Sequence, residues 1–196
     1  MRDRTIRRAF ADLFAAVALS AAVGACSSPD PVLYTIAPVN GATKTASPQI
    51  IVIDRVVIAK YLDRSQIVQS SEDYRVDLKS NDWWAEPLGS MLRRVLRQEL
   101  AQRLPQSSIL SETGAVSATA DATIDIDFQR LDENKSGGVV LQAQVSVGFK
   151  NSKAPMLRSF NFTVPSMALG VAGEVPAIST AVGQLADGLV TMLAAR

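Results

Sequence analysis

Few residues in this chain could do chemistry. Its 196 residues include one cysteine, Cys26, and no histidine. Triads of the Ser-His-Asp or Cys-His type need an imidazole base, and zinc sites draw mainly on Cys and His. A disulfide needs a second thiol. The sequence therefore excludes these nucleophilic systems, most transition-metal sites and any internal disulfide.

Two aspartates are the remaining candidates for catalysis. Asp125 and Asp127 alternate with apolar residues in a predicted strand, so both carboxylates lie on one face. Such a pair could bind a cation or perform acid–base chemistry. No third acid stands at a defined spacing, and Gly137-Gly138 lacks the pattern of a phosphate-binding loop. We interpret the pair as the polar face of a strand, and we expect no catalytic residue, no cofactor, no metal and no enzymatic activity.

The charge balance argues against nucleic acid as a partner. The chain has 20 Lys and Arg against 19 Asp and Glu, but residues 1–25 hold four arginines and two acids. The remainder is left with 16 bases and 17 acids, without the basic excess that phosphate-backbone binding needs. Arg93, Arg94 and Arg97 could bind lipid phosphates, but such a cluster is more typical of a solvated outer helix face.

The N-terminus has the organisation of an export signal. A basic segment (2–8) precedes an apolar stretch of 11 residues, Leu13–Val23, which is too short to span a bilayer of about 30 Å. Val23-Gly24-Ala25-Cys26 follows and resembles the lipobox of bacterial lipoproteins. We therefore predict a signal peptide at 1–25, a lipid on Cys26 and a tether at 26–32; an ordinary secretory signal with an incidental cysteine is the alternative.

The resemblance to lipoproteins also has implications for the membrane in which the protein is anchored. Residue 27 is Ser rather than the Asp that retains many lipoproteins in the inner membrane, which favours the inner leaflet of the outer membrane, facing the periplasm. Arg7-Arg8 leaves open whether the general or the twin-arginine route exports the chain. Acyl chains such as palmitate contribute about 0.8 kcal/mol per buried CH₂, so two or three of them make a stable anchor.

Residues 33–196 have the hydrophobic patterns of one α/β domain. Apolar residues recur at helical spacing between Trp84 and Leu104 and between Pro176 and Ala194. Segment 38–48 looks like a linker, and Asn134–Gly138 and 151–155 look like hairpin turns. We expect a two-layer sandwich, with a mainly antiparallel sheet and both long helices on one face. The predicted strands are 33–36, 50–59, 65–70, 74–79, 123–129, 139–149 and 159–164.

Two aromatic sites are candidate partner contacts. Trp83 and Trp84 stand at the predicted start of the first helix, where neighbouring side chains cannot face the same way. Either both rings flank the core or one serves a partner surface. Tyr61 and Leu62 lie in a predicted polar turn and raise the same possibility. The apolar segment Pro165–Pro176 has weak secondary-structure signals, and such a loop would be a contact site if exposed.

Most of the mature chain resembles one known family. The distinctive part lies between residues 33 and 105 and contains, in order, Leu33-Tyr34-Thr35-Ile36, the strand 50–59, the run 61–68 (YLDRSQIV), Trp84-Ala85-Glu86-Pro87-Leu88 and the helix end 100–105 (LAQRLP). These motifs are similar to those of the PqiC-type auxiliary lipoproteins of ABC transporters, which accompany MCE-domain proteins. Residues 33–196 would then form a single domain of that type.

The resemblance implies a non-enzymatic accessory component of an intermembrane lipid transport system. Its partners would be an MCE-domain protein with the associated inner-membrane permease and ATPase, and it would tie that assembly to the outer membrane. A homo-oligomer is also compatible with such a role. The alternative is a structural lipoprotein of another envelope machine, such as lipopolysaccharide insertion or peptidoglycan-synthase activation.

Overall fold

The computed structural model describes residues 29–72 and 74–195. Cys26 and the signal peptide lie outside the described residues. Residues 32–196 group into one compact unit.

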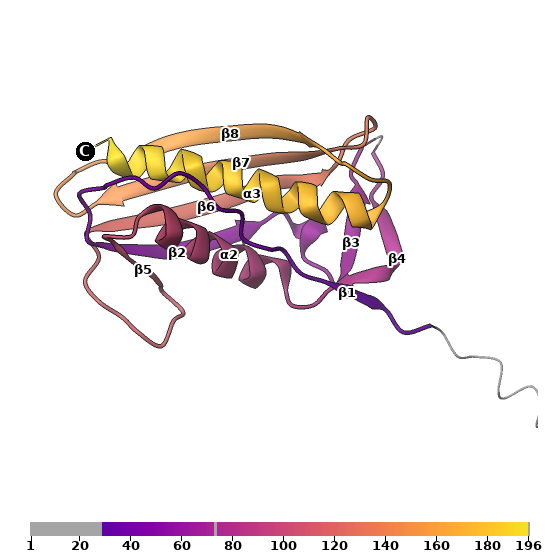
Figure 1. Cartoon of the computed structure of the whole chain (residues 1–196), viewed down its shortest axis with the longest axis horizontal. Coiled ribbons are helices and arrows are strands. Elements are labelled where there is room, and N and C mark those ends of the chain that lie inside the picture. The colour runs from indigo at the N-terminus through magenta and orange to yellow at the C-terminus, as the bar shows by residue number, and fades with distance from the viewer. Residues whose placement is uncertain (1–28, 73, 196) are drawn as a thin grey trace, which may run out of the picture. The chain divides into compact units, whose positions relative to one another are not determined.

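One mixed sheet of eight strands forms a layer of this unit (Figure 1). Two α-helices, α2 (Leu88–Arg103) and α3 (Val171–Ala194), form the other, and a short 3-10 helix, η2 (Lys60–Leu62), follows β2. The strands are β1 Val32–Tyr34, β2 Ile50–Ile58, β3 Gln66–Ser70, β4 Asp77–Trp84, β5 Ser108–Ser111, β6 Ala122–Glu133, β7 Gly138–Phe149 and β8 Met156–Pro165.

The sheet is organised around β6. On one side β6 pairs antiparallel with β7, which pairs antiparallel with β8. On the other side β2 runs parallel to the first half of β6. At the far end of β6, β3 pairs with it in place of β2, through Ser70 and Glu133. β5 adds to β2 in parallel, while β4 and then β1 extend the sheet beyond β3. The sheet is therefore mixed, and its two longest ladders are antiparallel.

Both helices cover the same face of the sheet (Figure 1). α3 packs over β6, β7 and β8, whereas α2 packs against β2, β5 and α3. The predicted two-layer α/β sandwich with two long helices on one face is thus confirmed.

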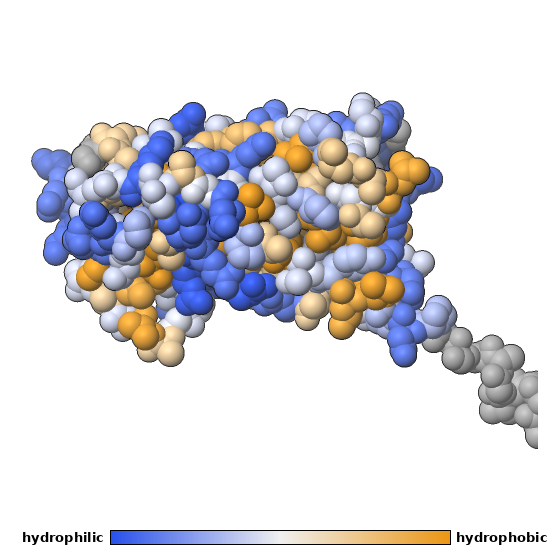
Figure 2. Space-filling view, viewed as in Figure 1, coloured by the Kyte–Doolittle hydropathy of each residue, from blue (hydrophilic) through white to orange (hydrophobic). Residues whose placement is uncertain are grey.

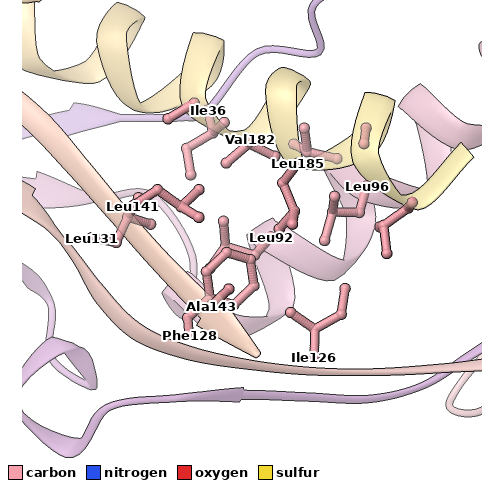
Figure 3. Packing of buried hydrophobic residues seen from close by; sticks show 14 of the residues in the cluster. Ile36, Leu92, Leu96, Ile126, Phe128, Leu131, Leu141, Ala143, Val182 and Leu185 are labelled. Atoms are coloured by element: carbon pink, nitrogen blue, oxygen red, sulfur yellow. The ribbon is translucent and has the colours of Figure 1, made fainter. Parts of the chain in front are cut away.

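The alternating strand patterns build the core. In β6, Ile124, Ile126 and Phe128 are buried under the helices, while Asp125 and Asp127 lie on the opposite face. The pairing register shifts between Phe128 and Arg130, and beyond this irregularity consecutive residues of β6 are buried. Figure 3 shows how the strands and helices interlock through residues such as Phe128, Leu141, Ala143, Leu92, Leu96, Val182 and Leu185. Side chains therefore fill the space between the two layers.

The start of the first long helix differs from expectation. Trp83 and Trp84 belong to β4, and α2 begins only at Leu88, directly after Pro87. Trp83 pairs with Gln66 of β3 and Leu33 of β1, contacts between segments far apart in sequence. These cross-strand pairings override the local helical pattern, from which the helix was expected to begin at Trp84.

The second long helix begins five residues before the predicted start at Pro176. Segment Pro165–Pro176 is therefore an exposed loop only up to Gly170. Pro176 lies on the exposed side of the helix, where water can replace the missing backbone donor. Among the described helices, α3 is the one long and apolar enough to cross a membrane, but most of its apolar side chains are buried in this core.

The small residues of α3 allow close packing within the domain. A Cβ added to Gly188 would overlap the Phe160 ring of β8, and one added to Gly183 would press on Val39. These glycines contact the domain's own sheet and β1–β2 connection.

Candidate interaction site

Two of the runs that carry the family resemblance, 61–68 and 84–88, meet at one corner of the domain. Residues 63–65 follow η2, and residues 84–88 join β4 to α2; together they line a hollow of about 320 Å³. The backbone N–H of Trp84 donates to the carbonyl of Ser65 at 2.7 Å, which fixes the two segments to each other. We call residues 60–65 and 83–88 the corner.

The corner orients the four aromatic and apolar candidates differently. Leu62 is buried in the core, and Trp84 is only 7% exposed, so neither presents its side chain to a partner. Trp83 is partly exposed, and its indole N–H donates to the carbonyl of Ser80 at 3.2 Å. Tyr61 is half-buried. Of the four, Tyr61 and Trp83 retain accessible surface.

Ionic groups surround the corner. Arg94 of α2 forms an ion pair of 2.6 Å with Glu86 and also donates to the Thr35 hydroxyl at 3.2 Å. Lys60 and Asp63 pair at 2.6 Å on the exposed side. The corner therefore combines partly exposed aromatic rings, a residue type enriched in protein interfaces, with charged side chains of the kind found at interface rims.

Tyr61 belongs to a polar network that reaches the end of β6. Its hydroxyl donates to the buried Asp132 carboxylate at 2.6 Å, and the Ser71 hydroxyl donates to the same oxygen at 2.8 Å. The other Asp132 oxygen accepts from Arg130 at 2.9 Å. Burial raises the pKa of Tyr61 to about 12, and the hydrogen bond to Asp132 adds to the shift. This hydrogen bond holds Tyr61, and with it η2, on the sheet.

The connection between β1 and β2 (residues 35–49), which we call the strap, is ordered along the helices rather than a free linker. In Figure 1 it runs beside α2 and α3. Side chains of the helices satisfy its backbone: Val39 N–H donates to Glu99 at 2.8 Å, and Gly41 both donates to and accepts from the Gln102 side chain at 3.0 Å. Its composition suggested a linker, but these distant side-chain partners supply the order.

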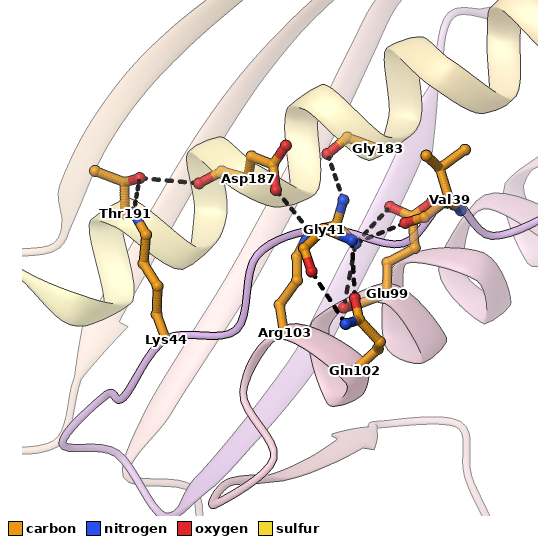
Figure 4. Close-up of polar contacts among 9 residues, drawn as sticks. All are labelled: Val39, Gly41, Lys44, Glu99, Gln102, Arg103, Gly183, Asp187 and Thr191. Carbon is orange, nitrogen blue, oxygen red and sulfur yellow. Dashed lines mark hydrogen bonds and ion pairs between the residues drawn. The ribbon is translucent and has the colours of Figure 1, made fainter.

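Arg103 at the end of α2 joins the strap to both helices (Figure 4). Its side chain is 1% exposed. The guanidinium donates to the carbonyls of Val39 at 2.9 Å and Gly183 at 3.2 Å, and to the Asp187 carboxylate at 2.7 Å. Sequence inspection missed this residue, although it follows Leu96 and Leu100 on the buried stripe of the helix.

Glu99 lies beside Arg103 and is almost fully buried, with a carboxylate oxygen 3.7 Å from the guanidinium. Desolvation raises its pKa to about 7, although the hydrogen bond from Val39 and the charge of Arg103 act in the opposite direction.

The uncovered face of the sheet contains the aspartates considered for catalysis. Asp125 pairs with Arg55 of β2 at 2.9 Å, and Asp127 is exposed. They border a shallow hollow of about 530 Å³ that also includes Val57 and Leu157. Within residues 29–72 and 74–195, no group of three or more His, Cys, Asp or Glu is placed to hold a metal.

Solved structures share this architecture. The crystal structure of an uncharacterized protein matches with a TM-score of 0.69 at 16% identity, covering 83% of this chain and 98% of that chain. Protein XCC0632 from Xanthomonas campestris, of the family DUF330, matches with a TM-score of 0.65 at 15% identity, covering 81% and 92%. At these identities the likeness shows the fold alone.

A comparison with curated protein sequences found no match. A family model described as "ABC-type transport auxiliary lipoprotein component" matches residues 34–190, from the end of β1 into the last turns of α3. This range includes the corner, the strap and both helices. The chain therefore belongs to the family of ABC-type transport auxiliary lipoprotein components, and it is an accessory, membrane-anchored protein of an envelope transport system.

Proposed function

We propose that the protein is an outer-membrane-anchored, non-enzymatic accessory component of an intermembrane lipid transport system that uses an MCE-domain protein. The observation that carries this proposal is the family match over residues 34–190, preceded eight residues earlier by the lipobox cysteine, Cys26. In this proposal Cys26 carries the lipid, and the domain faces the periplasm from the inner leaflet.

The filled core supports a role as a connector rather than a carrier. A protein that encloses a lipid needs an apolar cavity of several hundred cubic ångströms. Here the facing residues of sheet and helices interlock, and Phe128, Leu92 and Leu185 are fully buried (Figure 3). Lipid would therefore pass through a partner, while this domain holds that partner at the membrane.

The corner is the surface that we assign to the MCE-domain partner. It brings together two of the sequence runs that resemble the PqiC-type family, and it retains the accessible rings of Tyr61 and Trp83. Aromatic side chains surrounded by paired charges favour a protein partner over a phosphate-rich one.

The test is a cross-linked pull-down of the tagged, full-length lipoprotein from gently solubilised membranes, with partners identified by mass spectrometry. The proposal predicts recovery of an MCE-domain protein with its permease and ATPase. Recovery of an outer-membrane barrel or a peptidoglycan synthase instead would refute the transport role and support the alternative envelope machine.

A matched pair of charge reversals locates the contact. Asp63→Lys changes an exposed residue of the corner, and Asp127→Lys changes an exposed aspartate on the uncovered sheet face. We expect the first variant to reduce recovery of the MCE-domain protein and the second to leave it unchanged. Equal recovery from both variants would place the contact elsewhere on the domain.

A further inference from the structure

Three loops lie at one end of the sheet, and two of them, together with the adjoining ends of β3 and β4, line a hollow of about 580 Å³. They are the β3–β4 turn (71–72 and 74–76 of the described residues), the β6–β7 turn (134–137) and the β8–α3 loop (166–170). In Figure 1 all three lie at the right-hand end of the domain, where β1 also begins. We call this set the loop end.

The loop end exposes large apolar side chains. Met167 is 94% exposed and Leu169 is 99% exposed, and the Tyr74 ring at the tip of the β3–β4 turn is fully exposed. Met167 also borders an adjoining, mainly apolar hollow of about 310 Å³ along the first turns of α3. Figure 2 shows hydrophobic residues on the surface at this end of the domain. Single exposed apolar residues are common, but neighbouring ones at the tip of a loop indicate a contact surface.

The β8–α3 loop is held in place. The Ser166 N–H donates to the Gly137 carbonyl at 3.1 Å, and the Ser166 hydroxyl donates to Glu133 at 3.0 Å. Gly170 has φ of 70°, a left-handed conformation that suits glycine, and its carbonyl accepts the first backbone bonds of α3. The two apolar side chains therefore project from an ordered support.

The position of the tether indicates what covers this surface. The domain begins at Val32, where β1 pairs with the last residues of β4, Asp82 to Trp84, while the β3–β4 turn precedes the other end of β4 at Asp77. In Figure 1, β1 and the three loops lie on the same right-hand side of the domain. Cys26 precedes Val32 by six residues, and a segment of that length spans at most roughly 20 Å. A lipid on Cys26 therefore keeps the loop end close to the bilayer.

We infer that the loop end is a second membrane contact, with Met167 and Leu169 inserting into the acyl region of the bilayer that holds the Cys26 lipid. Tyr74 lies at the headgroup level, where aromatic side chains accumulate. The inference depends on the lipid anchor of the proposed function and adds a fixed orientation of the domain on the membrane. That orientation would leave the long axis of the sheet pointing toward the periplasm.

The contact that we infer is apolar rather than electrostatic, and two arginines at or beside the loop end are held in ion pairs. Arg75 pairs with Asp77 at 2.8 Å, and Arg130 pairs with Glu72 at 3.1 Å. Insertion should therefore persist at high salt. Loss of the contact on adding salt would contradict this basis.

The test uses a fluorophore on a single engineered cysteine. The chain has no cysteine other than Cys26, which the lipid occupies, so Leu169→Cys can be labelled selectively with an environment-sensitive NBD group. The matched control is Val116→Cys, an exposed aliphatic residue (67%) in the connection to the opposite end of β6. The full lipoprotein is reconstituted into vesicles of phosphatidylethanolamine and phosphatidylglycerol.

We expect the label at 169 to shift to the blue, to resist iodide and to be quenched by spin-labelled lipids, whereas the label at 116 behaves as in water. Equal iodide quenching at both positions would overturn the inference. Protection at 169 that appears only after the MCE-domain protein is added would overturn it as well, assigning the loop to a protein contact.

Flotation of the vesicles separates this inference from the proposed anchor. Protein that floats but keeps its 169 label in water overturns the membrane contact alone. Protein that fails to float shows that the lipid anchor is absent, and the membrane contact falls with it.

A second variant does not depend on labelling the loop itself. Met167→Asp with Leu169→Asp changes side chains that are almost wholly exposed, so the fold should be retained. We expect a label at Tyr74→Cys to lose its lipid protection in this variant but to keep it in a Val116→Asp control. Unchanged protection in both variants would contradict the inference.

Discussion

Replacing Arg103 by methionine tests whether one buried cation holds the strap and the two helices together. Methionine keeps much of the aliphatic volume but removes every donor of the guanidinium. The carbonyls of Val39 and Gly183 would lose a charged donor, and Asp187 would lose its ion pair. Glu99 would remain buried without a cation beside it.

The expected cost follows from this environment. Removing one partner of a buried ion pair costs about 3–5 kcal/mol where the groups left behind stay desolvated. Glu99 and the Gly183 carbonyl stay buried here, whereas Asp187 is largely exposed and can turn to water. A domain of this size is stable by roughly 5–15 kcal/mol, so Arg103→Met should lower the melting temperature by on the order of 10 °C. The matched control is Arg55→Met, which breaks an exposed ion pair with Asp125 and should cost less than about 1 kcal/mol.

Glu99→Gln is a second variant whose loss of stability can be compared with that of Arg103→Met. Burial raises the pKa of Glu99 to about 7, so its charge is already partly lost at neutral pH. Glutamine keeps an acceptor for the Val39 N–H, and the variant should therefore cost about 1 kcal/mol or less.

The assay is urea unfolding of the purified lipoprotein, followed by circular dichroism for the whole domain and by tryptophan fluorescence near β4. Arg103→Met should shift both transitions by a similar amount. A loss for Arg103→Met no larger than that for Arg55→Met would refute the reasoning that the buried guanidinium holds the strap on the helices.

The remaining predictions concern one buried acid, two glycines and the anchor. Glu174 is fully buried, and desolvation, followed by repulsion from Glu133, raises its pKa to about 8. The carboxyl releases its proton near pH 4.5 in the unfolded chain and only near pH 8 in the folded chain, so the free energy of unfolding should fall as the pH rises from 4.5 to 8. Glu174→Gln should remove this loss, which is on the order of a few kcal/mol, in melting curves at pH 5 and 8. Gly188→Ala should destabilise the domain by about 1–3 kcal/mol because its Cβ meets a phenylalanine ring, whereas Gly89→Ala, which has space in α2, should stabilise it by about 0.5–1 kcal/mol in the same unfolding assay. Cys26→Ala should abolish incorporation of labelled palmitate, and palmitate retained by this variant would show that another group carries the lipid.

The strands with one apolar and one polar face were predictable because their signal is local. In the alternating part of β6 (122–129), burial follows the polarity of each residue, and the turn at Asn134–Gly138 is a short-range feature of the chain. The apolar stripe of α2 was predictable for the same reason. The sequence motif ending at Cys26 predicts export and a lipid anchor without any reference to the fold.

Other features depend on partners that lie far away in the sequence. The strap looked like a linker because its own residues do not indicate order, and Glu99, Gln102 and Arg103 supply its hydrogen-bonding partners from α2. Trp83 and Trp84 joined a strand because β1 and β3 pair with it. The same long-range packing buried Leu62 and Trp84 and left Tyr61 and Trp83 accessible at the corner.

The sequence by itself thus determined the composition of the two layers and the absence of histidine chemistry, and it predicts the lipid anchor at Cys26. Only the tertiary structure decided which charged groups are buried, which aromatic rings remain accessible and which loops gather at the end where β1 begins. The physical reason is that periodicity records the preference of each residue for water or core. Burial of Arg103, or exposure of Met167 and Leu169, depends on what the rest of the chain brings to that place.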